Sequence, residues 1–290
     1  MEGADHHIPG VLYRLDARAE PIPLLVDSPH NGTHWPPDFD HIVTEAEMMS
    51  SVDAYVDELF SHTPDVGGTL IAALFPRSYV DPNRAEDDLD EKLIDGDWPF
   101  PLNPTKKSEF GMGVVRRLIL KAKPLYSRPL SVEEVLHRLE TYHRPYHSAV
   151  GSAFDALHQD HGTVFHINAH SMKPVGNAMN EDEGQSRADV VLGDRDGTSC
   201  DRDFTHLVAE LFAGKGYSVK VNEPYKGVEL VHRYSEPDGG RHSLQVEINR
   251  ALYLDDKSFE RSAGFGALKN DLDEILVGIA NWVRDQRPST

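Results

Sequence analysis

The chain has 290 residues, of which 39% are hydrophobic and 27% charged, and its formal net charge is −19. The length suits a single α/β domain spanning residues 1–290. A surface this acidic repels phosphate backbones, which argues against nucleic-acid binding. It also repels small anions, so a dicarboxylate substrate would need a local cluster of arginines to reverse the field.

The chain contains one cysteine, Cys200, so a disulfide within the chain is impossible and a reducing compartment fits. No N-terminal segment has the layout of a signal peptide, and no apolar run approaches about 18 residues. We therefore expect a cytoplasmic protein without a membrane partner. No pattern in the sequence indicates an oligomeric state.

Short apolar runs bounded by Pro, Gly and Asp alternate with segments of helical periodicity. Residues 1–20 form a polar lead-in, and the mixed charge, Pro and Gly of residues 86–112 predict a long excursion over the surface. Pro145 is expected to bend the helix that contains it. In chain order, the patterns predict a strand at 21–26, a helix at 45–61, strands at 69–75 and 163–168, with a helix at 131–158 between them, a helix at 201–214, strands at 217–221 and 243–249, and a helix at 258–285.

Strands that alternate with helices indicate an α/β fold, in which helices cover both faces of a central sheet. In such sheets, binding sites gather at the carboxyl ends of the strands. Three polar clusters lie at such ends in this sequence, around His30, His170 and Glu247.

Two histidines at strand ends are candidate metal ligands. His30 lies in a Pro/Gly loop after the first buried strand, and His170 follows the strand at 163–168. Imidazoles in these places make good ligands because the sheet fixes their position. His34 is interpreted as a surface residue, because nearby Gly and Pro disfavour the helix that would align it with His30. His166 is interpreted as a hydrogen-bonded core residue.

A catalytic zinc commonly takes two histidines and one carboxylate. Asp53, in the helix that follows His30, is one candidate for the third ligand. Glu45, Glu47 and Asp57 compete with it. For each of the four, the alternative is a solvated position on a helix face.

Glu247 lies between Val246 and Ile248 in the alternating strand at 243–249. A carboxylate inside a buried strand is unfavourable unless it is paired or functional. The functional interpretation is a general base that activates a water at a metal. The structural interpretation is an ion pair with Arg250 or with another buried arginine.

Arg77, Arg84 and Arg250 follow or end buried strands, and Asn83 directly precedes Arg84. Arginine binds a carboxylate through two parallel hydrogen bonds. The group therefore indicates a positive pocket for an anionic substrate. Its alternative role is to neutralise neighbouring aspartates.

Seven segments of the chain, taken in order, resemble the N-formylglutamate amidohydrolase family, which is distantly similar to the zinc carboxypeptidases. They extend over most of residues 22–255. The segments are SPHNG at 28–32, RSYVDPNR at 77–84, RPYH at 144–147, NAHSM at 168–172, DVVLGD at 189–194, NEPYKG at 222–227 and LQVEINR at 244–250.

The resemblance implies a phosphorylase/hydrolase-like α/β fold with a mixed sheet and one zinc per chain. It implies hydrolysis of N-formyl-L-glutamate to formate and L-glutamate, a step of histidine degradation. His30 and His170 would be zinc ligands, and Asp53 is preferred as the third by its place after His30. The resemblance places Glu247 where a catalytic glutamate is expected, and it maps Asn83 and Arg84 onto a pair that holds the substrate α-carboxylate. For the reaction itself we also expect Arg77 to stabilise the oxyanion, Arg250 to bind the side-chain carboxylate, and Tyr225 to contact the substrate.

Two positions depart from the family pattern. Asn168 stands where the family often has an aspartate, and Val228 stands where it often has a second glycine after Gly227. Asparagine can orient an imidazole through its carbonyl oxygen, but it adds no charge. Valine at 228 predicts a narrowed or reshaped substrate loop.

Two other functions stay open on the sequence. One is a metallocarboxypeptidase-like deacylase for another N-acyl amino acid or a peptide, which an open groove would favour over a small closed pocket. The other is a metal-free binding protein for acidic amino acids. The joint presence of His30, His170 and Glu247 argues against the second.

Overall fold

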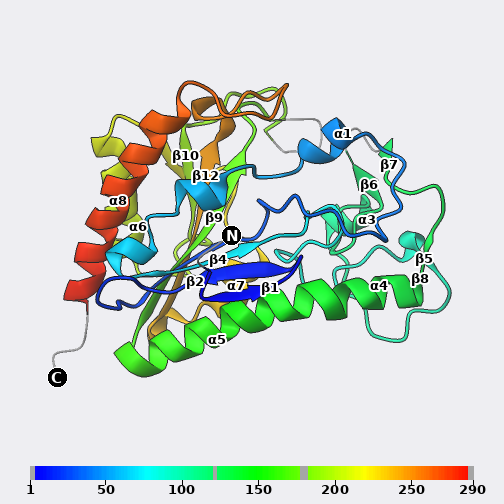
Figure 1. Cartoon of the computed structure of the whole chain (residues 1–290), viewed down its shortest axis with the longest axis horizontal. Helices are drawn as coiled ribbons and strands as arrows, with labels where there is room; N and C mark the ends of the chain where they lie inside the picture. The colour runs from blue at the N-terminus through cyan, green and yellow to red at the C-terminus, as the bar shows by residue number, and fades with distance from the viewer. Residues whose placement is uncertain (1–3, 120–122, 177–181, 287–290) are drawn as a thin grey trace.

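A computed structural model describes residues 4–119, 123–176 and 182–286 (Figure 1). Its centre is an eight-stranded sheet in the order β1-β2-β4-β3-β9-β12-β10-β11. The four central strands run parallel to one another, while β2 and β10 pair antiparallel with them. The sheet is therefore mixed, as predicted. Its strands are β1 (His6–Ile8), β2 (Leu12–Leu15), β3 (Leu24–Ser28), β4 (Thr69–Ala73), β9 (Val164–Met172), β10 (Val190–Gly193), β11 (Val219–Val221) and β12 (Arg241–Asn249).

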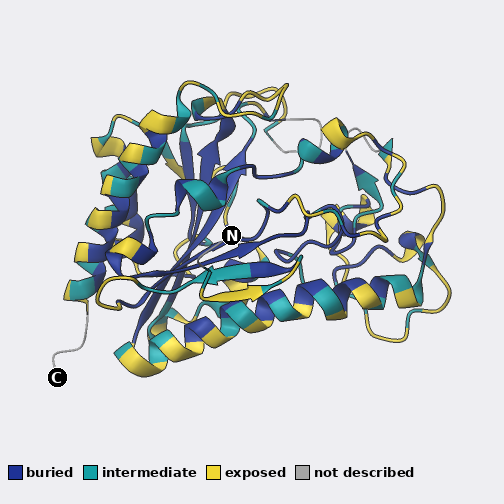
Figure 2. Ribbon diagram, in the orientation of Figure 1, coloured by how far each residue is buried: buried dark blue, intermediate teal, exposed yellow. Residues whose placement is uncertain are grey.

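Helices cover both faces of this sheet (Figure 1), and its central strands are buried (Figure 2). The long helix formed by α4, η4 and α5 lies along one face, and α6 and α8 lie along the other. Among the helices of the described residues, none combines the length and hydrophobicity that a membrane span requires. The helices are α1 (Glu45–Met49), α2 (Val56–Leu59), α3 (Lys106–Glu109), α4 (Val132–Arg138), the π-helical turn η4 (Leu139–His143), α5 (Arg144–His161), α6 (Arg202–Gly214), α7 (Glu229–Tyr234) and α8 (Phe265–Asp285).

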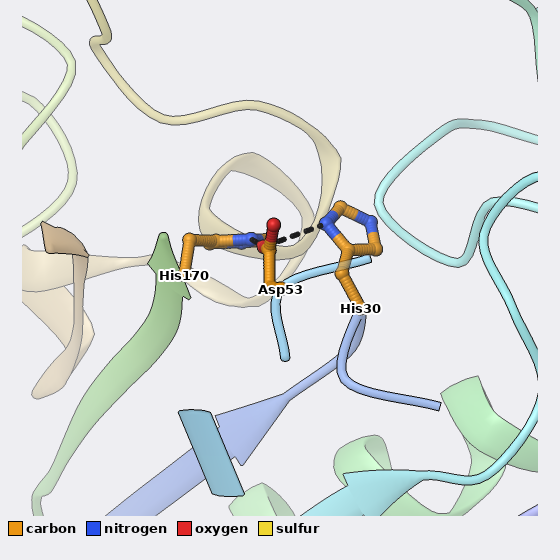
Figure 3. A group of neighbouring side chains, drawn as sticks. All are labelled: His30, Asp53 and His170. Carbon is orange, nitrogen blue, oxygen red and sulfur yellow. Dashed lines mark hydrogen bonds and ion pairs between the residues drawn. The ribbon is translucent and has the colours of Figure 1, made fainter. Parts of the chain in front are cut away.

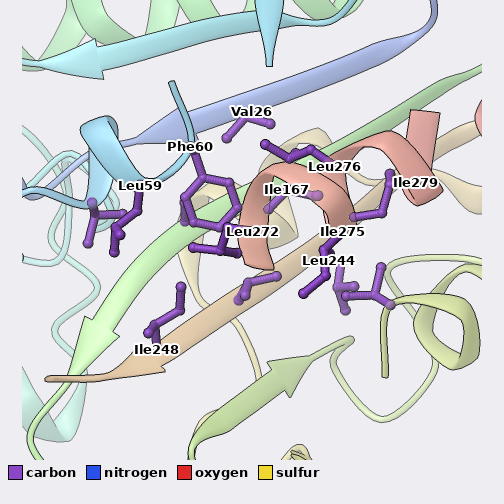
Figure 4. Packing of buried hydrophobic residues seen from close by; sticks show 14 of the residues in the cluster. Val26, Leu59, Phe60, Ile167, Leu244, Ile248, Leu272, Ile275, Leu276 and Ile279 are labelled. Atoms are coloured by element: carbon purple, nitrogen blue, oxygen red, sulfur yellow. The ribbon is translucent and has the colours of Figure 1, made fainter. Parts of the chain in front are cut away.

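Alternation along the central strands separates an apolar face from a polar one. Ile167 on β9 and Val246 on β12 belong to the hydrophobic core that α8 covers (Figure 4). Successive side chains of a strand point to opposite faces. His170 and Glu247 therefore face the other side of the sheet, and both are buried there. The apolar face anchors the strands, and the polar face carries the candidate chemistry.

Truncation of Leu276 should destabilise the protein strongly, because this side chain of α8 is fully buried against the sheet (Figure 4). Leu276→Ala removes apolar contacts and leaves a cavity, which costs about 2–5 kcal/mol of unfolding free energy. The matched control is Val277→Ala, since Val277 is 43% exposed; it should change stability by less than about 0.5 kcal/mol. Urea denaturation of the three proteins measures the difference. Equal stability of both variants would mean that α8 does not seal this core.

Most predicted elements are confirmed within a few residues, but the first part of the chain differs. Residues 1–20 are not merely a polar lead-in, because β1 and β2 pair with each other and extend the sheet beyond β4. Residues 86–112 are not simply a surface excursion either. Leu89 and Leu93 are fully buried in the core that also contains α5.

The predicted continuous helix over 45–61 is wrong. It divides into α1 and α2, and Asp53 lies in the break between them. Tyr55 adopts a left-handed backbone conformation, with φ 63°, which a continuous helix cannot include. The backbone N–H of Asp53 donates to the carbonyl of His30 at 2.9 Å instead of to a helical carbonyl. The break therefore ties Asp53 to the loop that carries His30.

The helix predicted over 131–158 is confirmed, with an irregularity near Pro145. The π-helical turn η4 precedes α5, and Pro145 stands in the first turn of α5. Proline lacks the N–H that an uninterrupted α-helix needs at that point, so the hydrogen-bond ladder changes its spacing there.

Candidate active site

Three buried side chains from distant parts of the chain converge at one edge of the sheet (Figure 3). His30 comes from the loop after β3, Asp53 from the break between α1 and α2, and His170 from the end of β9. None of the three is more than 2% exposed. Their candidate ligand atoms all lie within 4.8 Å of one another.

The three side chains could hold a metal ion. Asp53 Oδ2 lies 3.1 Å from His170 Nδ1 and 3.5 Å from His30 Nδ1. His30 Nδ1 is buried without a hydrogen-bond partner. An unpaired buried ring nitrogen is costly unless it binds something. Two imidazole nitrogens and one carboxylate oxygen are the donor set of many catalytic zinc sites, so these residues fit a zinc ion.

A carboxylate orients the first histidine from behind. With its proton on Nε2, His30 donates to Asp81 Oδ1 at 2.7 Å. Arg77 donates to the other oxygen of Asp81 through Nε and Nη2, at 3.1 and 2.7 Å. Burial favours the neutral acid, but Arg77 and His30 hold the pKa of Asp81 well below its usual value. The ionised Asp81 therefore fixes the imidazole with Nδ1 directed at Asp53.

A chain of hydrogen bonds orients the second histidine. His170 Nε2 lies 2.7 Å from Asn168 Oδ1, and Asn168 Nδ2 donates to Asp27 Oδ1, also at 2.7 Å. Asp27 is fully buried and accepts a further bond from Tyr146. Asn168 thus orients the imidazole through its carbonyl oxygen, as predicted. Position 168 lacks the carboxylate that the family often has there. In this chain a carboxylate, that of Asp27, is the next member of the hydrogen-bond chain after Asn168.

Arg250 is engaged by the protein through all three guanidinium nitrogens. They donate to Asp53 Oδ1 at 2.8 Å, to Ser171 Oγ at 3.0 Å and to the Ser50 carbonyl at 3.0 Å. Burial opposes ionisation of Asp53, yet contacts with His170, His30 and Arg250 hold its pKa well below the usual value. Arg250 therefore keeps Asp53 in place and ionised. Its contact with a substrate carboxylate stays a prediction.

Glu247 stands beside His170 on the neighbouring strand, since the two are register partners of β12 and β9. It is 9% exposed, and its oxygen Oε1 accepts a hydrogen bond from Gln245 at 3.0 Å. Burial raises the pKa of Glu247 above its usual value, and the charge of Asp53 adds to the effect. In the described part of the chain it forms no ion pair, and Arg250 binds Asp53 instead. A carboxyl group in this state suits proton transfer.

All of the predicted site residues line one cavity of about 220 Å³. Asn83 Oδ1 accepts from the Leu230 N–H at 3.0 Å, which fixes the amide, and its Nδ2 lies 3.1 Å from His170 Nε2. Because that ring nitrogen donates to Asn168, it cannot also accept, and the amide hydrogens of Asn83 stay available to a ligand. The predicted residues in the cavity wall are His30, Asp53, Arg77, Asn83, Arg84, His170, Tyr225, Glu247 and Arg250.

The competing carboxylates lie elsewhere. Glu47 binds Lys123 at 2.8 Å, Asp57 accepts a hydrogen bond from Tyr13, and Glu45 lines a different depression. His34 is exposed and His166 is buried between Asp27 and Ser243, both as predicted. Val228, the second departure, lies in the cavity wall just before α7.

Several polar residues around the cavity were not anticipated from the sequence. Asp81 lies inside the segment 77–84, which already contained the candidates Arg77, Asn83 and Arg84. Its place among them was a signal that it also belongs to the site. Lys107, Arg116 and Arg187 also line the cavity. Lys107 lies on the short helix α3, and the other two lie in irregular segments. The composition of all these segments is ordinary for a surface, so no local signal distinguishes the three residues.

Residues 22–254 match the model of the N-formylglutamate amidohydrolase family. The chain belongs to this family. It is 27% identical to an N-formylglutamate deformylase from Pseudomonas aeruginosa over 91% of this chain and 95% of that protein. It is also 27% identical to the deformylase of the same name from Pseudomonas putida, over 81% of this chain and 83% of that one.

A crystal structure of N-formylglutamate amidohydrolase from Ralstonia eutropha JMP134 is similar over 95% of this chain and 99% of that one, with 40% identity and a TM-score of 0.90. The two proteins therefore share their fold over nearly the whole chain. This family member is an amidohydrolase, and the cavity described above is its candidate active site.

Proposed function

We propose that the protein hydrolyses N-formyl-L-glutamate to formate and L-glutamate and that it uses one zinc ion per chain. This reaction would be a step of histidine degradation. The proposal rests on one observation, which is that three kinds of side chain line the same cavity. They are the His30–Asp53–His170 donor set, the buried carboxyl group of Glu247 and a group of cations. The names of the two deformylases and of the similar crystal structure support the choice of substrate.

Residues of the chain have separate tasks in this reaction. His30, Asp53 and His170 would hold the zinc, which supplies a Lewis acid that polarises the formyl oxygen and lowers the pKa of a water. Glu247 takes a proton from the attacking water and delivers it to the leaving amine. Arg77 uses Nε and Nη2 on Asp81, and its Nη1 can meet the negative charge that develops on the formyl oxygen.

The cations of the cavity suit an acidic substrate. Asn83 and Arg84 would bind its α-carboxylate, because an amide and a guanidinium offer several donors to two oxygens. The guanidinium carbon of Arg187 lies 5.1 Å from the centre of the Tyr225 ring, and both side chains belong to the cavity wall. In a chain of net charge −19, this local positive field is what would admit an anion.

A panel of N-formyl, N-acetyl and larger N-acyl derivatives of glutamate and aspartate, with detection of the released amine, tests the substrate. N-formyl-L-glutamate should have the highest kcat/KM, since the cavity is small. Faster release from a peptide ending in glutamate would instead support the carboxypeptidase-like alternative. Binding of glutamate without any turnover, in metal-free protein, would support the binding-protein alternative.

Arg84→Ala should weaken substrate binding while the zinc stays bound. Loss of one charge-assisted contact costs about 1.5–3 kcal/mol, which should raise KM by roughly 10- to 150-fold. The matched control is Arg144→Ala, because Arg144 is an exposed arginine on α5 that binds Glu86. Steady-state kinetics and metal analysis of both variants make the comparison. A variant with normal KM and lowered kcat would contradict a positioning role for Arg84.

A further inference from the structure

Four cationic side chains of the cavity wall are close enough to repel one another: Arg77, Arg84, Lys107 and Arg116. The described residues give them two close carboxylate partners, Asp81 and Asp88. Arg77 takes the short bond to Asp81. Arg84 Nη1 lies 3.4 Å from Asp88 and Arg116 Nη2 lies 3.5 Å from Asp81, longer than the roughly 2.7–2.9 Å of a charge-assisted hydrogen bond.

Two of these cations are poorly compensated. Arg116 is 12% exposed, and its Nε is buried without a partner. Burial and the charge of Arg77 lower the pKa of Arg116 to about 9. The ammonium group of Lys107 forms no hydrogen bond or ion pair within the described residues. Lys107 as a whole residue is exposed, but desolvation of its ammonium group, together with the charges of Arg84 and Arg77, lowers its pKa to about 8. Glu247 faces this group from β12 and offsets only part of the repulsion.

Both side chains belong to one segment, residues 105–116, which we name the basic loop. Asp88 Oδ1 accepts from the Thr105 N–H at 2.7 Å, and the Asp88 carbonyl accepts from the Val114 N–H at 2.8 Å. The Val114 carbonyl in turn accepts from the Asp81 N–H at 2.7 Å. The basic loop is thereby fixed at both ends to the segment that carries Arg84, and its two cations have defined positions.

We propose that Lys107 and Arg116 of the basic loop bind the side-chain carboxylate of the substrate and so select an acidic amino acid over its neutral isostere. The inference rests on the proposed function. Arg84 serves the α-carboxylate, and Arg250 is already engaged by Asp53, so the second carboxylate needs other donors. Met112 also lines the cavity and offers an apolar contact for the methylene groups between the two carboxylates.

Two substrates of nearly equal shape test this assignment: N-formyl-L-glutamate and N-formyl-L-glutamine. Lys107→Met and Arg116→Met should each lower kcat/KM for the glutamate derivative by roughly 10- to 100-fold, mainly through KM. The value for the glutamine derivative should change little. Lys106→Met is the matched control, because both lysines are exposed residues of helix α3 and only Lys107 is among the residues that line the cavity.

Arg84→Ala should differ from both variants by lowering the values for the two substrates together. The assignment would be overturned if Lys107→Met or Arg116→Met lowered kcat/KM for both substrates equally. It would also be overturned if these variants kept the wild-type ratio of kcat/KM between the glutamate and the glutamine derivative. Arg116 is partly buried, so Arg116→Lys accompanies it as a variant that keeps the charge; it should retain more of the preference than Arg116→Met.

Failure of the proposed function gives a different result. If wild-type protein hydrolyses neither compound, calorimetric titration with L-glutamate and L-glutamine still tests the basic loop. Tighter binding of glutamate that is lost in Lys107→Met would support the subsite without the reaction. Equal binding of the two amino acids by wild type would reject it.

Discussion

His30→Ala and His170→Ala should each lose most of the zinc that the wild-type protein binds at about one ion per chain. Each substitution removes one of three protein ligands, and two ligands hold the ion far less tightly. The remaining ring still has its orienting partner, Asp81 or Asn168, so the fold should survive. Metal analysis after exhaustive dialysis against buffer without metal makes the measurement, and thermal melting checks the fold.

His34→Ala provides the matched control for this experiment. His34 is an exposed histidine in the loop that also carries His30, and it lies outside the candidate metal site. Its substitution should leave the zinc content unchanged. Full zinc occupancy in both ligand variants would refute the assignment. Wild-type protein that takes up no zinc even when zinc is added would point to the metal-free binding protein instead.

Glu247→Gln should keep the fold and the zinc but lose turnover by at least about 10²- to 10⁴-fold, which general acid–base catalysis typically contributes. Glutamine has nearly the shape of glutamate, but it cannot take a proton from the attacking water. The hydrogen bond from Gln245 should persist, because the new side chain still offers a carbonyl oxygen. Turnover, zinc content and melting temperature are measured on the same sample.

The structural interpretation of Glu247 predicts the opposite pattern. If the carboxylate only compensated a buried cation, Glu247→Gln would melt much earlier and retain most of its turnover. The arrangement of Arg250 argues against this, because its guanidinium binds Asp53 at 2.8 Å. Glu133→Gln, an exposed position on α4, is the control and should match wild type in every measurement.

Local patterns were sufficient to identify most of the helices and strands. The strand around Ile167 and the helix over 201–214 appear within a few residues of their predicted bounds. The helix over 45–61 failed because the periodicity of Val52, Val56 and Leu59 is real, yet the hydrogen bond from Asp53 to the His30 carbonyl competes with the helix. A contact between two distant segments decided the local structure there.

The sequence by itself determined which side chains share a face. His170 and Asn168 lie two residues apart on one strand, so both must point the same way, and the apolar neighbours of Glu247 already indicated its burial. The motifs around His30 and Arg84 also sufficed to indicate the family. These conclusions depend on spacing within single elements, which the backbone geometry controls.

Only the tertiary structure decided which elements are neighbours. β3, β9 and β12 are adjacent in the sheet although long segments separate them in the chain, and that order brings His30, His170 and Glu247 to one cavity. The engagement of Arg250 by Asp53 and the arrival of Lys107 and Arg116 from the basic loop are equally non-local. A period-two pattern specifies the buried face of a strand but not its partner, because pairing depends on how all the elements pack together.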